Sequence, residues 1–158
     1  MTKPFFDLNS FLIKGNCMEG INLVYGPAAS GKTTCCLLAS ISMAKKGEKV
    51  IYMDTETGFS IERVKQLCGE DYSKIIDNLF LLKIKSFDDQ KKKFSELFNL
   101  IKEGKFSLIV VDTLGAHYRK VLKEDTKRVN LELIEQLKIL KHITRYNLPV
   151  LITNQVYS

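Results

Sequence analysis

Features of membrane, secreted and zinc-binding proteins are largely missing from this sequence. No apolar run approaches the ~18 residues that a membrane span needs, and the first residues, MTKPFFDLNS, lack the charged-then-apolar pattern of a secretory signal. The four cysteines contain no C-x-x-C pair and only two histidines are present, which argues against a Cys/His zinc site. We therefore expect no membrane attachment, reduced thiols and a cytoplasmic location.

The composition is that of an ordinary globular protein. Of the 158 residues, 45% are hydrophobic and 27% are charged, and a chain of this length can fold as one domain that buries about 70% of its unfolded surface. The 24 Lys and Arg residues outnumber the 18 Asp and Glu residues and give a net charge of +6. This is a mild bias toward polyanionic partners that many proteins without such partners share. With no repeat, low-complexity tract or linker, residues 1–158 are expected to form a single domain.

Residues 21–34, INLVYGPAASGKTT, carry the most specific motif of the chain. A short apolar run leads into the phosphate-loop pattern G-x-x-x-x-G-K-[ST]. Such a loop turns backbone N–H groups toward nucleotide phosphates and opens a helix whose positive end faces the anion. Lys32 would reach the β- and γ-phosphates, and the Thr33 hydroxyl would bind Mg²⁺. Glycine-rich turns also join strands to helices elsewhere, but the complete GKT ending favours a nucleotide site. Its predicted residues are Gly26, Pro27, Ala28, Ala29, Ser30, Gly31, Lys32, Thr33 and Thr34.

Apolar runs that suit strands alternate with segments of helical periodicity along the rest of the chain. Strands are predicted at 21–25, 50–54, 79–84, 108–112 and 150–153. Helices are predicted at 33–46, from Ser60 onward, between Ser86 and Gly104, and around 133–143. This alternation predicts an α/β fold with a mainly parallel sheet flanked by helices.

Polar residues follow four of these strands, and the ligands of open α/β sheets lie outside the carboxyl ends of the strands. Asp112 ends the run LIVVD, a Walker B pattern whose carboxylate holds Mg²⁺, directly or through water, opposite Thr33. Glu56 is a candidate base for a water in line with the γ-phosphate, and Gln155 is a candidate γ-phosphate sensor. In the alternative interpretation, Asp112 only forms a turn, Glu56 is a solvated acid in a loop, and Gln155 is an ordinary polar residue at a strand end.

The segment HYRKVLKEDTKR, residues 117–128, joins the fourth predicted strand to the longest predicted helix. Its basic residues and a tyrosine that can stack on a base suit single-stranded nucleic acid. The alternative is a charge-rich solvated loop, because two acidic residues dilute the signal. The candidate nucleic-acid contacts are Tyr118, Arg119, Lys120, Lys123, Lys127 and Arg128.

Several motifs together resemble the RecA/RadA recombinase superfamily. They are GPAASGKTT at 26–34, YMDTETGFSIERV at 52–64, LIVVDTLGAHYR at 108–119 and LITNQVYS at 151–158. The DTE triplet with its following glycine, the S-x-E-R helix start and the T-N-Q-V-Y ending are most similar to the archaeal RadB family, whose members lack the N-terminal DNA-binding domain of RadA. The resemblance covers nearly the whole chain from about Phe6.

The resemblance implies roles for the predicted site residues. It implies ATP at residues 26–34, Mg²⁺ at Thr33 and Asp112, a water-activating Glu56 and a sensor at Gln155, with Arg63 of the S-x-E-R segment near the adenine. It makes 117–128 the first DNA-facing loop. The implied activity is DNA binding in homologous recombination and repair, with a weak DNA-dependent ATPase at most and other recombination proteins as partners.

The resemblance also implies a fold. This is a P-loop NTPase core of RecA type with strand order 3-2-4-5-1, which further C-terminal strands extend beyond the phosphate-loop strand. Because this chain stops at Ser158, we expect those strands to be missing and the phosphate-loop strand to form an exposed edge that promotes self-association. Two other interpretations stay open: a KaiC-type nucleotide switch that regulates protein partners without DNA, and an inactive remnant.

Overall fold

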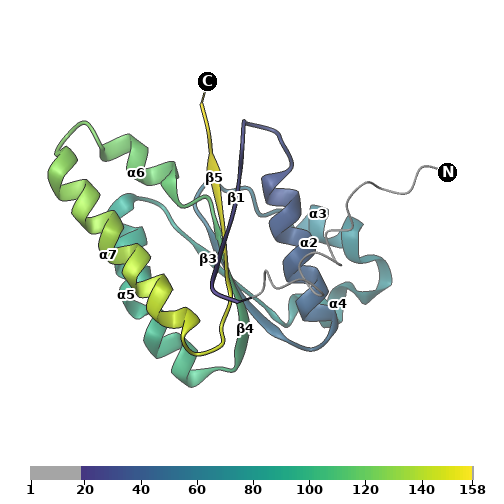
Figure 1. Ribbon diagram of the computed structural model, residues 1–158. Helices are drawn as coiled ribbons and strands as arrows, with labels where there is room; N and C mark the ends of the chain where they lie inside the picture. The colour runs from purple at the N-terminus through teal and green to yellow at the C-terminus, as the bar shows by residue number, and fades with distance from the viewer. Residues whose placement is uncertain (1–18, 158) are drawn as a thin grey trace.

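The computed structural model describes residues 19–157, and over that range helices surround a central parallel sheet (Figure 1). Residues 1–18 and 158 of the expected single domain lie outside the described range. The elements in chain order are β1 (Ile21–Gly26), α2 (Lys32–Lys45), β2 (Lys49–Asp54), α3 (Ile61–Cys68), the 3₁₀ turn η2 (Gly69–Asp71), α4 (Tyr72–Ile76), β3 (Leu79–Lys83), α5 (Phe87–Glu103), β4 (Phe106–Asp112), α6 (Gly115–Val121), α7 (Thr126–Thr144) and β5 (Val150–Gln155).

The five strands of the sheet are all parallel and follow the order β1-β5-β4-β2-β3. This is the order 3-2-4-5-1, read from the other edge, so the predicted topology is confirmed. The inner strands β2 and β4 are buried along most of their length, because helices cover both faces of the sheet. Parallel pairing brings the carboxyl ends of all strands to one edge, which is where the predicted residues Glu56, Asp112 and Gln155 lie.

Two hydrophobic cores flank the sheet, one on each face. Helices α2, α3 and α4 pack on one face against Tyr52, Val110 and Leu151, while α5 and α7 pack on the other face, where Ile152 lies. Figure 1 shows these two groups of helices on opposite sides of the strands. Residues alternate between the two faces along each strand. No helix between residues 19 and 157 is long and apolar enough to span a bilayer.

Side-chain caps begin two of the predicted helices. The Ser60 hydroxyl accepts a hydrogen bond from the Arg63 N–H (3.2 Å) at the start of α3. The Ser86 hydroxyl accepts one from the Asp89 N–H (3.0 Å) at the start of α5. Each cap satisfies a backbone donor that has no partner inside its helix, and both helix starts predicted from the sequence are confirmed.

Strand β1 lies at the edge of the described sheet and pairs only with β5 there. Its residues Ile21, Leu23 and Tyr25 are 39%, 57% and 68% exposed, respectively. The pairing Leu23↔Ile152 puts these three on the face that α5 and α7 cover elsewhere. An exposed edge at the phosphate-loop strand is therefore present in the described part of the chain, as expected.

Candidate functional site

The phosphate loop connects β1 to α2 and forms one wall of a cavity of about 350 Å³. Gly31 has φ 87° and ψ 12°, a left-handed conformation that glycine adopts without a steric penalty. This turn leads the chain directly into α2 at Lys32. The first turn of α2 contains no acidic residue, so the positive end of the helix beside the cavity is not neutralised by its own sequence.

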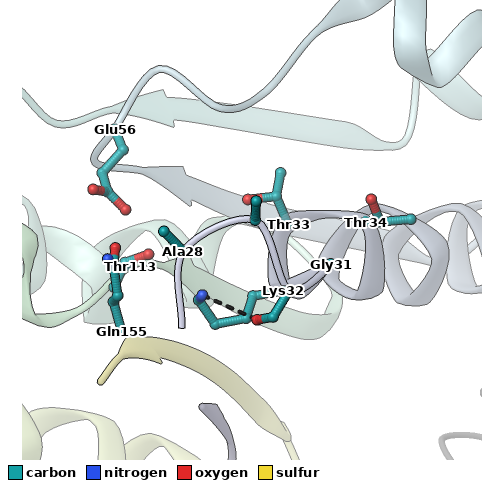
Figure 2. A pocket seen from close by; sticks show the side chains of 10 residues that line it. Ala28, Gly31, Lys32, Thr33, Thr34, Glu56, Thr113 and Gln155 are labelled. Atoms are coloured by element: carbon teal, nitrogen blue, oxygen red, sulfur yellow. Dashed lines mark hydrogen bonds between the residues drawn. The ribbon is translucent and has the colours of Figure 1, made fainter. Parts of the chain in front are cut away.

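Side chains from three strand ends complete the cavity wall. Residues 28–34 line it together with Glu56 after β2, Thr113 after β4 and Gln155 at the end of β5. Figure 2 shows the Glu56 carboxylate and the Gln155 side chain on the same side of the loop, with Thr113 between them. The structure thus brings together loop residues 28–34, the predicted base and the predicted sensor, whereas the predicted Gly26 and Pro27 do not line the cavity.

The Lys32 ammonium is folded over the loop (Figure 2). Its Nζ donates hydrogen bonds to the carbonyl oxygens of Gly26 (3.1 Å) and Pro27 (2.5 Å) and to the Ser30 hydroxyl (3.3 Å). All three acceptors are neutral, so they leave the positive charge of Lys32 uncompensated. The Lys32 ammonium, the N-terminus of α2 and the Ser30 hydroxyl lie at one cavity. This set of donors fits a nucleoside triphosphate.

The predicted metal residues converge beside this cavity. The Thr33 hydroxyl oxygen and Asp112 Oδ2 lie 3.5 and 3.9 Å, respectively, from the position that a Cβ would take at Gly58. Asp112 is 3% exposed and does not itself line the cavity. Among residues 19–157 no cluster of three or more His, Cys, Asp or Glu side chains could hold a metal ion alone. One carboxylate and one hydroxyl suit Mg²⁺, which takes its remaining ligands from phosphates and water.

Three hydroxyl groups hold the Asp112 carboxylate in place, and the longest of the three bonds is the one that Thr113 Oγ1 donates to Oδ1 at 3.4 Å. Thr153 Oγ1 donates to Oδ1 at 2.6 Å, and the Tyr52 hydroxyl donates to Oδ2 at 2.8 Å. Burial, with smaller contributions from nearby Cys36 and Asp112, raises the pKa of Tyr52 far above its ordinary value, so the phenol remains a donor. Sequence reasoning missed Tyr52, because its partner lies 60 positions away and no local pattern connects the two.

Asp54 is a second residue that sequence reasoning missed. Its carboxylate accepts hydrogen bonds from the backbone N–H groups of Glu56 (3.3 Å), Gly58 (3.0 Å) and Phe59 (3.1 Å). These bonds shape the turn that carries Glu56 to the cavity. An aspartate that begins a turn and accepts from N–H groups a few residues on is a known pattern, so the DTETG segment contained a usable signal.

Arg63 lies outside the cavity. It is an exposed residue in the first turn of α3, and its Nη1 donates to Gln66 Oε1 at 3.3 Å. The structure therefore does not bring Arg63 together with the other predicted nucleotide contacts. Its contact with an adenine stays a prediction.

The segment 117–128 is not the loop that the sequence predicted. Residues up to Val121 belong to α6, and those from Thr126 belong to α7, which Asp125 caps by accepting from the Arg128 N–H (3.0 Å). His117 is buried on the inner side of α6, with Nε2 hydrogen-bonded to the Ile84 carbonyl oxygen (3.0 Å). The loop prediction is wrong because this helix is too short for its periodicity to stand out among the charges.

The residues predicted to contact nucleic acid differ in their exposure to solvent. Lys120, Lys123 and Lys127 are exposed, whereas Tyr118 and Arg119 are only partly exposed. Tyr118 donates its hydroxyl hydrogen to Asn130 Oδ1 (2.7 Å).

Arg119 donates to Asn154 Oδ1 (3.2 Å), and the exposed Arg128 pairs with Glu132 (3.2 Å). The lysines therefore provide the accessible positive charge at this end of the sheet.

In the part of the chain that the structure describes, Cys35, Cys36 and Cys68 are free thiols. Cys36 and Cys68 are buried and Cys35 is half-buried. Burial, aided by the Asp112 carboxylate, raises the pKa of Cys36 well above its ordinary value. A neutral, packed thiol is chemically inert.

A phosphate loop between β1 and α2, an aspartate at the end of β4 and this strand order define a P-loop domain of RecA type. Comparison with known proteins leads to the same class. The family model for Rad51 matches residues 3–158. The chain belongs to the Rad51 family.

Individual relatives carry the name DNA repair and recombination protein RadB. That of Methanobrevibacter smithii is 39% identical over 151 residues, which are 93% of this chain and 64% of the relative. That of Methanosphaera stadtmanae is 37% identical, with 93% and 64% covered, and that of Methanocaldococcus jannaschii is 39% identical, with 92% and 70% covered. The resemblance to RadB is confirmed, and the KaiC-type alternative gains no support. The chain spans slightly less than two thirds of the first two relatives.

Proposed function

We propose that this protein binds ATP with Mg²⁺, binds DNA and assists homologous recombination and DNA repair as a RadB-like protein. The names of its relatives support this role. The observation that carries the proposal is the contact between the basic segment and the end of β5, next to the cavity residue Gln155: Arg119 Nη1 donates to Asn154 Oδ1 at 3.2 Å. We also infer that the chain forms one RecA-like core and works in the cytoplasm.

The nucleotide part of the proposal assigns a task to each cavity residue. The loop N–H groups and Lys32 would bind phosphates, and Thr33 and Asp112 would hold Mg²⁺. When bound, ATP and Mg²⁺ supply the transferable phosphoryl group and a Lewis acid. Glu56 would accept the proton of an attacking water, and Gln155 would donate a hydrogen bond to the terminal phosphate. A weak, DNA-dependent ATPase is the activity that we infer.

The DNA part of the proposal rests on the exposed charges of α6, of the turn that follows it and of the start of α7. Lys120, Lys123 and Lys127 would contact DNA phosphates, and such contacts make affinity fall with salt concentration. Single-stranded DNA is the preferred form in this proposal, because Tyr118 lies among the basic residues. Other recombination proteins are the protein partners that it implies.

The experiment that tests the proposal is binding of a fluorescent oligonucleotide, single-stranded and duplex, at several salt concentrations with and without ATP·Mg²⁺. We expect salt-dependent binding that changes with ATP. In Lys120→Gln the salt slope for single-stranded DNA should fall by about 0.7, the loss of one phosphate contact. Lys102→Gln makes the same charge change in the last turn of α5, so it should leave the slope unchanged.

Nucleotide binding is tested separately with a fluorescent ATP analogue. Lys32→Ala should abolish binding with little change in melting temperature, and Glu56→Gln should retain binding while ATP hydrolysis falls. ATP binding without any DNA binding would overturn the DNA part and favour a nucleotide switch that acts on protein partners. Undiminished binding in Lys32→Ala would overturn the nucleotide part.

A further inference from the structure

Arg119 connects the basic helix α6 to the end of β5. Its Nη1 donates to Asn154 Oδ1 at 3.2 Å, and its guanidinium carbon lies 4.9 Å from the centre of the Tyr157 ring. A hydrogen bond and a cation–π contact thus tie one side chain to one strand end. In this arrangement Arg119 faces the sheet, unlike the exposed Lys120 beside it.

Gly115 makes this close approach possible. A Cβ at this position would lie 2.6 Å from Asn154 Oδ1 and 2.9 Å from Arg119 Nη1, which is closer than real Cβ atoms come to such neighbours. The buried Gly115 is the first residue of α6. Gly115, Arg119 and Asn154 therefore form one packed contact between the helix and the strand.

Asn154 and Gln155 are neighbours in β5 that face opposite sides of the sheet. Ile152, two residues before Asn154, belongs to the core under α5 and α7, whereas Leu151 belongs to the core under α2. Asn154 accordingly meets α6 on one face, and Gln155 reaches the phosphate cavity on the other. One peptide joins them, so a displacement of Gln155 also displaces the partner of Arg119.

We propose that Arg119 is a positioning residue that transmits changes at Gln155 through Asn154 to α6, and so couples nucleotide binding to DNA affinity. This inference rests on the proposed function and replaces direct phosphate contact as the main task of Arg119. Coupling between two sites commonly changes affinity by about 5- to 150-fold. Without the link, the lysines at α6 can still contact DNA, but the DNA affinity no longer depends on the nucleotide.

The test compares Arg119→Gln with Lys120→Gln, two neighbouring changes that each remove one positive charge. For each protein, the DNA dissociation constant is measured with and without ATP·Mg²⁺ at several salt concentrations. Arg119→Gln should bring the ratio of the two constants close to one and leave the salt slope unchanged. Lys120→Gln should keep the wild-type ratio and lower the slope by about 0.7. Asn154→Ala removes the same bond from the other side, so it should behave like Arg119→Gln.

The opposite pattern would overturn the inference. If Arg119→Gln keeps the wild-type ratio and lowers the salt slope, Arg119 is a phosphate contact. Hydrogen exchange of α6 amides, measured with and without ATP·Mg²⁺, tests the same link when no DNA is present. ATP should change exchange over residues 115–121 in the wild type but not in Arg119→Gln. If the wild type binds no DNA but ATP still changes α6 exchange, the proposed DNA function is refuted and the coupling stands. If ATP does not change α6 exchange in the wild type, the coupling is refuted.

Discussion

Replacing Tyr52 by Phe removes a single hydroxyl from the support of Asp112. That hydroxyl donates to Asp112 Oδ2 at 2.8 Å, and the ring that remains still packs edge-on against Phe59, with centroids 5.1 Å apart. Tyr52 is fully buried and Asp112 is 3% exposed, so water cannot replace the lost donor. A hydrogen bond to a charged group contributes about 1.5–3 kcal/mol. We expect the melting temperature to fall by about 4–8 °C, the equivalent of about 2 kcal/mol in a chain of this size.

Urea and thermal unfolding, followed by circular dichroism, measure this effect. The urea midpoint should fall while the m-value stays the same. Tyr25→Phe is the matched control, because it removes the same hydroxyl from a side chain that is 68% exposed and should change stability by less than about 0.5 kcal/mol. Equal melting temperatures for the two variants would refute the reasoning.

Alkaline pH provides a second test of the same hydrogen bond. Because burial raises the pKa of Tyr52 far above the ordinary value of about 10, the unfolded chain ionises this phenol at a pH where the folded protein keeps it neutral. The resulting stability is complete below about pH 10 and is lost as the pH rises further. The difference in unfolding free energy between wild type and Tyr52→Phe should shrink by up to about 1.4 kcal/mol per pH unit above that point. A constant difference from pH 8 to 11 would contradict this.

Other predictions concern a helix start, a thiol and the sheet edge. The hydrogen bond from Lys93 lowers the pKa of Asp89, so Asp89→Asn should lower the melting temperature at pH 7, and the loss should disappear as the pH falls below about 4; an equal loss at pH 3 would exclude the ion pair as its cause. Cys36, fully buried, should resist N-ethylmaleimide in the folded protein and react in urea, which peptide mass spectrometry measures; rapid labelling without urea would show that the site opens. Leu23→Lys, at a residue 57% exposed on β1, should reduce self-association in sedimentation velocity, and a wild type that is monomeric at micromolar concentration would count against this use of the edge.

The parts of the protein that follow from neighbouring residues could be predicted from the sequence. The loop at 26–34 is continuous, so its motif defines the turn into α2 and most of one cavity wall. Ser60 and Ser86 mark helix starts through hydrogen bonds from the N–H group of the residue three positions later. Apolar runs identify strands, and parallel connection through helices brings Glu56 and Gln155 to the same edge of the sheet.

Only the tertiary structure decided which side chains support and link these elements. Tyr52 meets Asp112 and Arg119 meets Asn154 across separations of 60 and 35 residues, and these pairings depend on strand register and helix placement that no local pattern encodes. The helix α6 forms where a charged loop was expected, because a short helix is stabilised mainly by what it packs against, here through the buried His117. The sequence by itself determined the nucleotide loop and the parallel sheet with helices on both faces. Long-range packing decided which side chains position Asp112 and which helix contacts the end of β5.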